Sequence, residues 1–146
     1  MKLFISHAHS DRKYVAELQA ALRDKGFDVF LDADCLTAGE DFGEKILSGI
    51  RNAELVLFVV PKESGEGKNA LFEVGAAKAL GKKIFAVMPH GRASGARDVA
   101  LGLADFIVLD TSATEPDSVA DIVESTVHRN AARQKLALEE RAERAR

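Results

Sequence analysis

Glu73 is the only acidic residue in the stretch NALFEVGAAKAL, residues 69–80, where most of the other side chains are apolar or small. No basic residue lies three or four positions before it, since Ala70 and Asn69 occupy those positions. A carboxylate among apolar side chains loses its hydration and needs hydrogen-bond donors in exchange. A ligand hydroxyl is one such donor, so Glu73 is a candidate binding or catalytic residue.

The helix itself offers a structural explanation for Glu73. With Asn69 as the N-cap, Glu73 falls at the end of the first turn, where the helix dipole favours an anion. Lys68 or Lys45 could also pair with it in the folded chain. Both explanations stay open on the sequence around Glu73 alone.

Other short patterns are weaker. The segment SGEGKN lacks the first glycine and the final Ser/Thr of a phosphate-binding P-loop, and no GxGxxG follows the first predicted strand. Phosphoacceptor receiver domains need clustered acids after that strand, where this chain has Ser6 and His7.

The histidines and the cysteine give little support for a metal or nucleophile site. His7 and His9 are spaced for metal binding but have no completing ligand nearby, so we expect no metal site there. Cys35 could be a nucleophile, but no base is visible beside it, and a plain loop cysteine is favoured. His90 and His128 stand alone in the sequence.

The composition is that of one ordinary globular domain. The 146 residues are 47% hydrophobic and 29% charged, with a net charge of -3, which argues against nucleic acid as a partner. We expect no membrane span and no signal peptide, because no apolar run is long enough. A single cysteine excludes an internal disulfide and fits a reducing cytoplasm.

Strands and helices alternate along the chain, which predicts an α/β fold with a parallel sheet and helices on both faces. The helix after the first strand is capped by Ser10 or Asp11 and ended by Gly26, and the helix over 69–80 is ended by Gly81. The predicted strands cover Lys2–Ser6, Phe27–Asp32, Glu54–Pro61, Lys82–Pro89 and Asp105–Asp110.

Ligands of such sheets bind beyond the carboxyl ends of the strands. The loops that begin at Ser6, Asp32, Pro61 and Pro89 are therefore the expected functional loops. We expect residues 1–130 to form one domain and residues 131–146 a charged helical extension. That extension is either solvated or pairs with another chain.

The order of these segments resembles a Toll/interleukin-1 receptor (TIR) domain. Three stretches follow one another at the family's spacing over about residues 2–89: FISHAHSDRKYVAELQAALRDKGFDVFLD, LTAGEDFGEKI and NALFEVGAAKALGKKI. A looser fit continues to about residue 129. The resemblance implies a flavodoxin-like three-layer fold whose five parallel strands have the order 2-1-3-4-5.

The resemblance also implies an activity. Many family members cleave NAD at the nicotinamide–ribose bond, with a glutamate of the third helix as catalytic residue, and Glu73 matches it. One carboxylate suffices because nicotinamide leaves as a neutral molecule, so the general acid of ordinary glycosidases is unnecessary. The carboxylate stabilises the cationic ribose and holds its hydroxyls. NAD would be the substrate, with no further cofactor, and the products nicotinamide and ADP-ribose or a cyclic ADP-ribose.

Further positions are implied to line the substrate site. Ser6 and His7 would border the nucleotide cleft, Asp32 would begin the loop that covers it, and Leu36 and Phe42 would offer apolar surface. Many members carry a tryptophan four residues before the glutamate. Here that residue is Asn69, which we expect to cap the helix and bind the ligand.

The resemblance implies a cytoplasmic defence or signalling effector that self-associates through the Asp32–Phe42 loop. Two other functions remain open. One is a TIR scaffold without enzymatic activity, and the other is an enzyme like the nucleoside deoxyribosyltransferases, whose helix resembles NALFEVGAAKALGKKI. A module that only binds a nucleotide signal is a related alternative.

Overall fold

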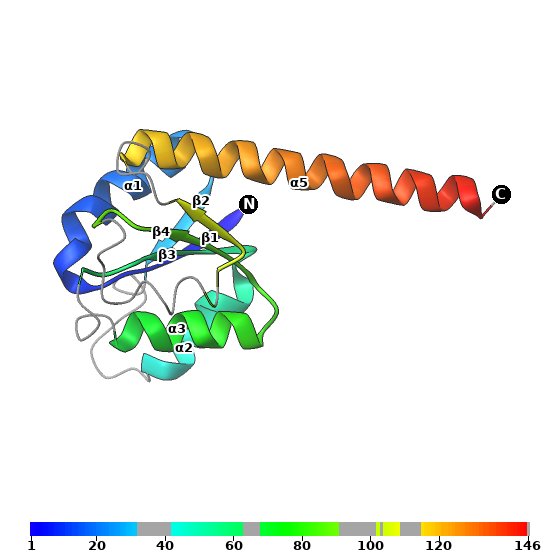
Figure 1. The fold of residues 1–146 in the computed structure, drawn as a ribbon. Coiled ribbons are helices and arrows are strands. Elements are labelled where there is room, and N and C mark those ends of the chain that lie inside the picture. The colour runs from blue at the N-terminus through cyan, green and yellow to red at the C-terminus, as the bar shows by residue number, and fades with distance from the viewer. Residues whose placement is uncertain (32–41, 63–67, 91–101, 103, 109–114, 146) are drawn as a thin grey trace.

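The computed structural model of the chain describes residues 1–31, 42–62, 68–90, 102, 104–108 and 115–145. Its elements form three layers, with a sheet between two pairs of helices (Figure 1). Asp32 and Leu36, two of the predicted site residues, lie outside the described residues.

Five parallel strands form the sheet, in the order β2-β1-β3-β4-β5. The predicted flavodoxin-like strand order is thereby confirmed. The central strand β3 is buried at every residue, which explains its unbroken apolar sequence. The strands are β1 (Lys2–Ser6), β2 (Asp28–Leu31), β3 (Leu55–Val59), β4 (Lys83–Val87) and β5 (Phe106–Val108).

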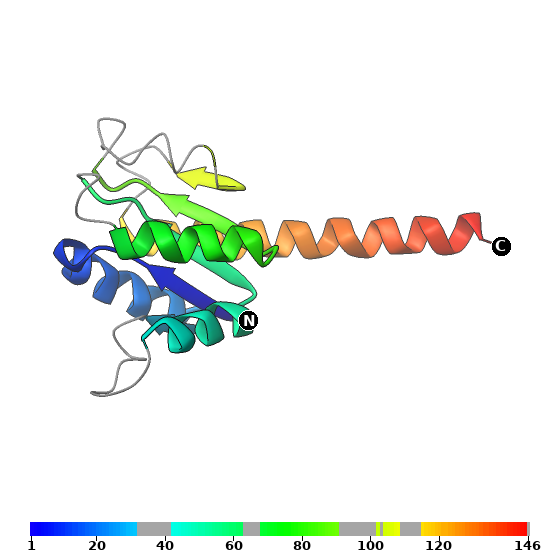
Figure 2. The ribbon, with the colours of Figure 1, turned by 90° about the horizontal axis from the view of Figure 1, so that it is seen from below.

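The helices are divided between the two faces of the sheet, as Figures 1 and 2 show together. On one face, α1 and α5 cover a core that includes Leu3 and Ile5 of β1, and on the other face α3 covers a core that includes Phe4. The helical segments are η1 (His9–Asp11), α1 (Arg12–Asp24), α2 (Phe42–Asn52), α3 (Lys68–Ala79) and α5 (Pro116–Arg144).

Two glycines end helices in the manner predicted from the sequence. Gly26 follows α1 with φ of +90°, and Gly81 follows α3 with φ of +73°. Side chains other than glycine rarely adopt this backbone conformation, so the chain can turn there directly into β2 and β4.

The last helix, α5, is much longer than the strands that it covers. It runs without interruption from Pro116 to Arg144, and its second half extends beyond the three layers (Figure 1). Its first half buries Val119, Ala120 and Val123 against the sheet and α1. The helix therefore crosses residue 130, and the domain boundary predicted there stays a prediction.

No helix in the described part of the chain is both long enough and apolar enough to span a bilayer.

Tyr14 reports on the contact between α1 and α5, because it is the only tyrosine of the chain and tryptophan is absent. Its ring is half-buried against the core, and burial raises its pKa, with smaller contributions from the Glu115 and Asp11 carboxylates. We therefore expect tyrosinate absorbance to appear in the folded protein only at a pH well above about 10, the ordinary value.

The urea-unfolded chain should titrate near that ordinary value and so releases the proton first. As the pH rises above about 10, the free energy of unfolding should consequently fall. A folded-state titration midpoint equal to that of the unfolded chain would contradict this account of Tyr14.

Candidate functional site

The carboxyl ends of β1 and β3 lie side by side, since Ser6 is paired with Phe58 in the parallel register. The chain leaves β3 at Val59 and enters α3 at Lys68, so the first turns of α3 lie near this edge of the sheet. This is the edge at which parallel α/β sheets bind ligands. Ser6 and Glu73 are thus brought to the same edge by the order of the elements.

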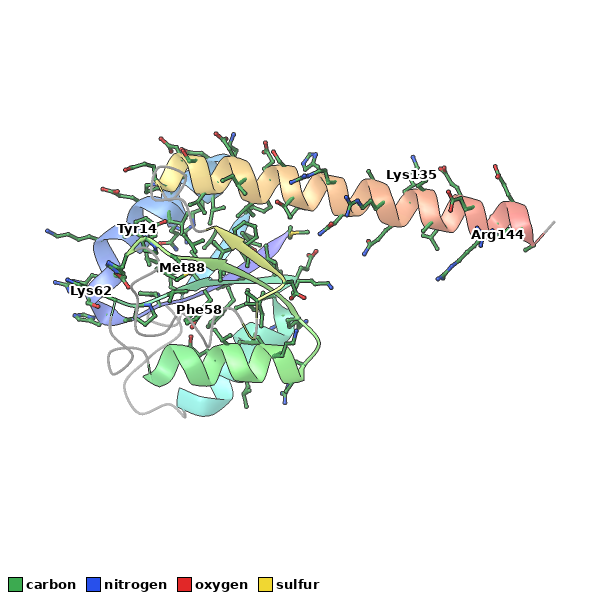
Figure 3. The ribbon with its side chains drawn as sticks, in the orientation of Figure 1. Tyr14, Phe58, Lys62, Met88, Lys135 and Arg144 are labelled. Atoms are coloured by element: carbon green, nitrogen blue, oxygen red, sulfur yellow. The ribbon has the colours of Figure 1, made fainter. Side chains whose placement is uncertain are left out.

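Ser6 and Glu73 also share one face of the sheet. Side chains alternate along a strand, and Phe4, two residues before Ser6, belongs to the core under α3. Ser6 therefore faces the α3 layer. Figure 3 shows Phe58, the register partner of Ser6, between the sheet and α3.

Glu73 lies on the side of α3 that packs on the sheet. Its neighbour Val74, and Ala77 one turn later, belong to the core cluster on that face. Glu73 is 0% exposed, as is Ser6, and the two are among only four buried polar or charged residues in the described part of the chain. The sequence pattern therefore located a carboxylate that the fold removes from water.

The Glu73 side chain does not face an open crevice in this structure, because it is 0% exposed. Glu73 is buried between α3 and the sheet, beside the core cluster that includes Val74 and Ala77. A substrate can reach the carboxylate only in a conformation that is more open at this edge.

A hydrogen bond ties two loops together at the same edge. His90, which follows β4, donates from Nε2 to Oδ1 of Asp11 over 2.7 Å. Asp11 is 5% exposed, and its Oδ2 is buried without a hydrogen-bond partner among the described residues. Nδ1 of His7 is likewise buried and has no such partner in the described part.

The sequence had suggested other roles for these residues. Asp11 occupies the N-cap position of α1, one of the two positions predicted for the cap, but its side chain makes no capping hydrogen bond. The carboxylate binds His90 instead. His90 stands alone in the sequence, but it follows a strand that ends at the same edge as β1, and that topology is the signal that brings it near Asp11.

Two more predicted residues are placed only through their backbone. Phe42 is the first residue of α2, and Asn69 is the second residue of α3. Asn69 therefore lies inside the helix, and its prediction as the N-cap is wrong, because α3 begins at Lys68. The roles of Phe42 and Asn69 in substrate binding stay predictions, as do those of Asp32 and Leu36.

Metal ligands are not grouped in the part of the chain that the structure describes. No set of three or more His, Cys, Asp and Glu side chains there could hold a metal ion. The chemistry of this edge is that of buried carboxylates, a hydroxyl and imidazoles.

A cavity of about 500 Å³ lies at the opposite edge of the sheet. It is bordered by Leu55 and Lys83, at the beginnings of β3 and β4, and by residues of α5. Its place at the amino ends of the strands separates it from Glu73, so we do not assign it to the same site.

A family model for the TIR domain matches residues 3–123. The chain belongs to the TIR domain family. The match begins in β1 and ends within α5, so it includes all five strands and the whole edge that carries Ser6, Asp11 and Glu73.

Curated relatives of this TIR domain include the "Probable 2′ cyclic ADP-D-ribose synthase TcpB" of Brucella abortus (strain 2308). It is 29% identical over 134 residues, which cover 85% of this chain and 52% of the relative. The chain therefore spans about half the length of the curated relative that it matches.

Solved structures share the fold at low identity. The TIR domain of the Toll-related receptor TRR-2 from Hydra magnipapillata has a TM-score of 0.66 at 18% identity, covering 84% of this chain and 95% of that chain. The Clostridium botulinum CMP N-glycosidase BcmB has a TM-score of 0.64 at 16% identity, covering 84% and 99%. These two likenesses establish the fold.

We expect the Asp11–His90 hydrogen bond to stabilise the folded chain. His90→Ala should lower the free energy of unfolding by about 1–3 kcal/mol, because it removes the partner of a buried carboxylate. Urea denaturation followed by circular dichroism measures the change.

His128→Ala is the matched control, since His128 is exposed on α5. It should change the free energy of unfolding by less than about 0.5 kcal/mol. Equal effects of the two substitutions would show that the bond to Asp11 contributes nothing to stability.

Proposed function

We propose that this TIR domain cleaves NAD at its nicotinamide–ribose bond, with Glu73 as the catalytic residue. The observation that carries the proposal is a fully buried carboxylate on the sheet-facing side of α3, at the carboxyl edge of a parallel sheet. Membership of the TIR family and the relative named as a probable 2′ cyclic ADP-D-ribose synthase support the same reaction class.

A single carboxylate suits this bond. Nicotinamide departs from a pyridinium as a neutral base, so the leaving group takes the bonding electron pair and needs no proton. The ribose is left with an oxocarbenium-like positive charge. A carboxylate that has been removed from water stabilises such a charge more strongly than a hydrated one, because the local dielectric constant is low.

Polar groups near Glu73 would orient the substrate. The Ser6 side chain faces the same layer from the end of β1, and Nδ1 of His7, which is buried here, would bind a ligand hydroxyl or phosphate once this edge opens. We further propose that the loop beginning at Asp32, with Leu36 and Phe42, covers the nucleotide, and that Asn69 binds it from α3.

The burial of Glu73 suggests how activity is controlled. A carboxylate that is 0% exposed cannot touch a ribose, so the reaction needs a more open arrangement of this edge. We propose that self-association of the TIR domain, through the Asp32–Phe42 loop, favours that arrangement and activates the protein as a defence or signalling effector. The product is ADP-ribose when water traps the ribose cation, and a cyclic ADP-ribose when a hydroxyl of the same molecule does.

Glu73→Gln tests the catalytic role of the carboxylate. The amide keeps the shape of the side chain and removes its negative charge, so nicotinamide release from NAD should fall at least about a hundredfold. Chromatography of NAD incubated with concentrated protein measures the release and separates linear from cyclic products. Circular dichroism should show that the variant remains folded.

The matched control is Glu17→Gln, which removes an exposed carboxylate from α1 and should leave nicotinamide release unchanged. Release by Glu73→Gln at the rate of the unaltered chain would remove Glu73 from the mechanism. CMP is incubated in parallel, and release of cytosine instead of nicotinamide would favour a nucleotide N-glycosidase over an NAD-cleaving enzyme.

A further inference from the structure

Most of the second half of α5 extends beyond the rest of the described chain, although Ala131, Arg133 and Gln134 still border the cavity at the amino ends of β3 and β4. Residues 131–145 are all exposed, including Leu136 at 57% and Leu138 at 64%. Figure 3 labels Lys135 and Arg144 on this part of the helix, well clear of the sheet and the other helices. The exposed segment is continuous with the packed half of α5. Because the packed half is already helical, the exposed segment can extend the helix without the cost of forming a first turn by itself.

Charges of opposite sign are separated along one face of this exposed segment. Positions three or four residues apart share a helix face. On one such face two arginines come first, Leu136 lies at the centre, and three glutamates follow. The residues of this face are Arg129, Ala132, Arg133, Leu136, Glu139, Glu140 and Glu143.

Part of this arrangement is unfavourable within a single helix, although Lys135–Glu139 and Glu140–Arg144 are favourable i, i+4 pairs. Arg129 and Arg133 are like charges at i and i+4, and so are Glu139 and Glu143, and both pairs repel in an isolated helix. Glutamates near the end of a helix also oppose its dipole. None of these four residues forms an ion pair with another described residue.

We propose that this face is the contact between two copies of the chain, whose α5 helices pair antiparallel around Leu136. A twofold axis through that leucine places Arg129 of one copy opposite Glu143 of the other, and Arg133 opposite Glu139. Each copy supplies the same patch, as an isologous interface requires. Each local repulsion is then offset by attraction to the oppositely charged side chains of the other copy.

The proposed dimer contact does not cover the edge of the sheet that carries the proposed catalytic site. The paired segment from Arg129 to Glu143 is about 21 Å long at about 1.5 Å per residue. It extends from the side of the molecule where β3 and β4 begin, whereas α3, which carries Glu73, begins at the side where they end (Figure 2). Dimerisation through α5 is thus independent of the proposed reaction and could join two TIR domains without covering Glu73.

Sedimentation velocity of the full chain tests the pairing. Because the contact is small, we expect a monomer–dimer equilibrium at concentrations on the order of 100 µM, weakened by added salt. R129E/R133E and E139R/E143R each place like charges opposite one another, so each should raise the dissociation constant at least tenfold. Lys13→Glu with Lys78→Glu, on exposed lysines of α1 and α3, makes the same charge change as the first variant and should have no effect.

Two further samples test the antiparallel register. An equimolar mixture of R129E/R133E and E139R/E143R should form a heterodimer, and the fourfold variant that combines them should dimerise again with itself. Circular dichroism confirms that α5 remains helical in each. Three results would each overturn the proposal. The unaltered chain could remain monomeric at about 1 mM, either double variant could dimerise as strongly as the unaltered chain, or the mixture of the two variants could stay monomeric.

Discussion

The parallel arrangement of β1, β3 and β4 is the constraint on which the site depends. Because all three strands run in one direction, their carboxyl ends meet at one edge, and every connection that follows begins there. Ser6, His90 and the start of α3 come from distant parts of the sequence, yet the sheet gathers them. The packing of α3 on the sheet then removes the Glu73 carboxylate from water. The proposed stabilisation of a ribose cation depends on that removal, because charges interact more weakly in water.

Much of the fold could be predicted from local patterns. The alternation of apolar strands and helices gave the five-stranded sheet, β1 was predicted with its observed bounds, and glycine marked the ends of α1 and α3. These features depend on the period of burial and on backbone conformation, which neighbouring residues largely decide. The strand order came from the resemblance to TIR domains rather than from those patterns.

The site was predictable only in part, because side-chain contacts join residues far apart in sequence. Glu73 stood out as an acid among apolar residues, and its burial agrees with that pattern. Its enclosure did not follow from the sequence, since it depends on how closely α3 packs on the sheet. The bond from His90 to Asp11 spans 79 positions, so the sequence around Asp11, which predicted the start of α1, gave no sign of it. The outward face of α5 carries a charge pattern that no ion pair among the described residues explains.

The location of the nucleotide site tests the account most directly. A non-hydrolysable carbocyclic analogue of NAD is added to isotope-labelled protein, at the concentration that releases nicotinamide from NAD, and backbone amide shifts are followed by NMR. The account predicts the largest shift changes at Ser6, His7 and Glu73, at the carboxyl edge of the sheet. Changes confined to Leu55, Lys83 and the α5 residues around the cavity at the opposite edge would contradict it.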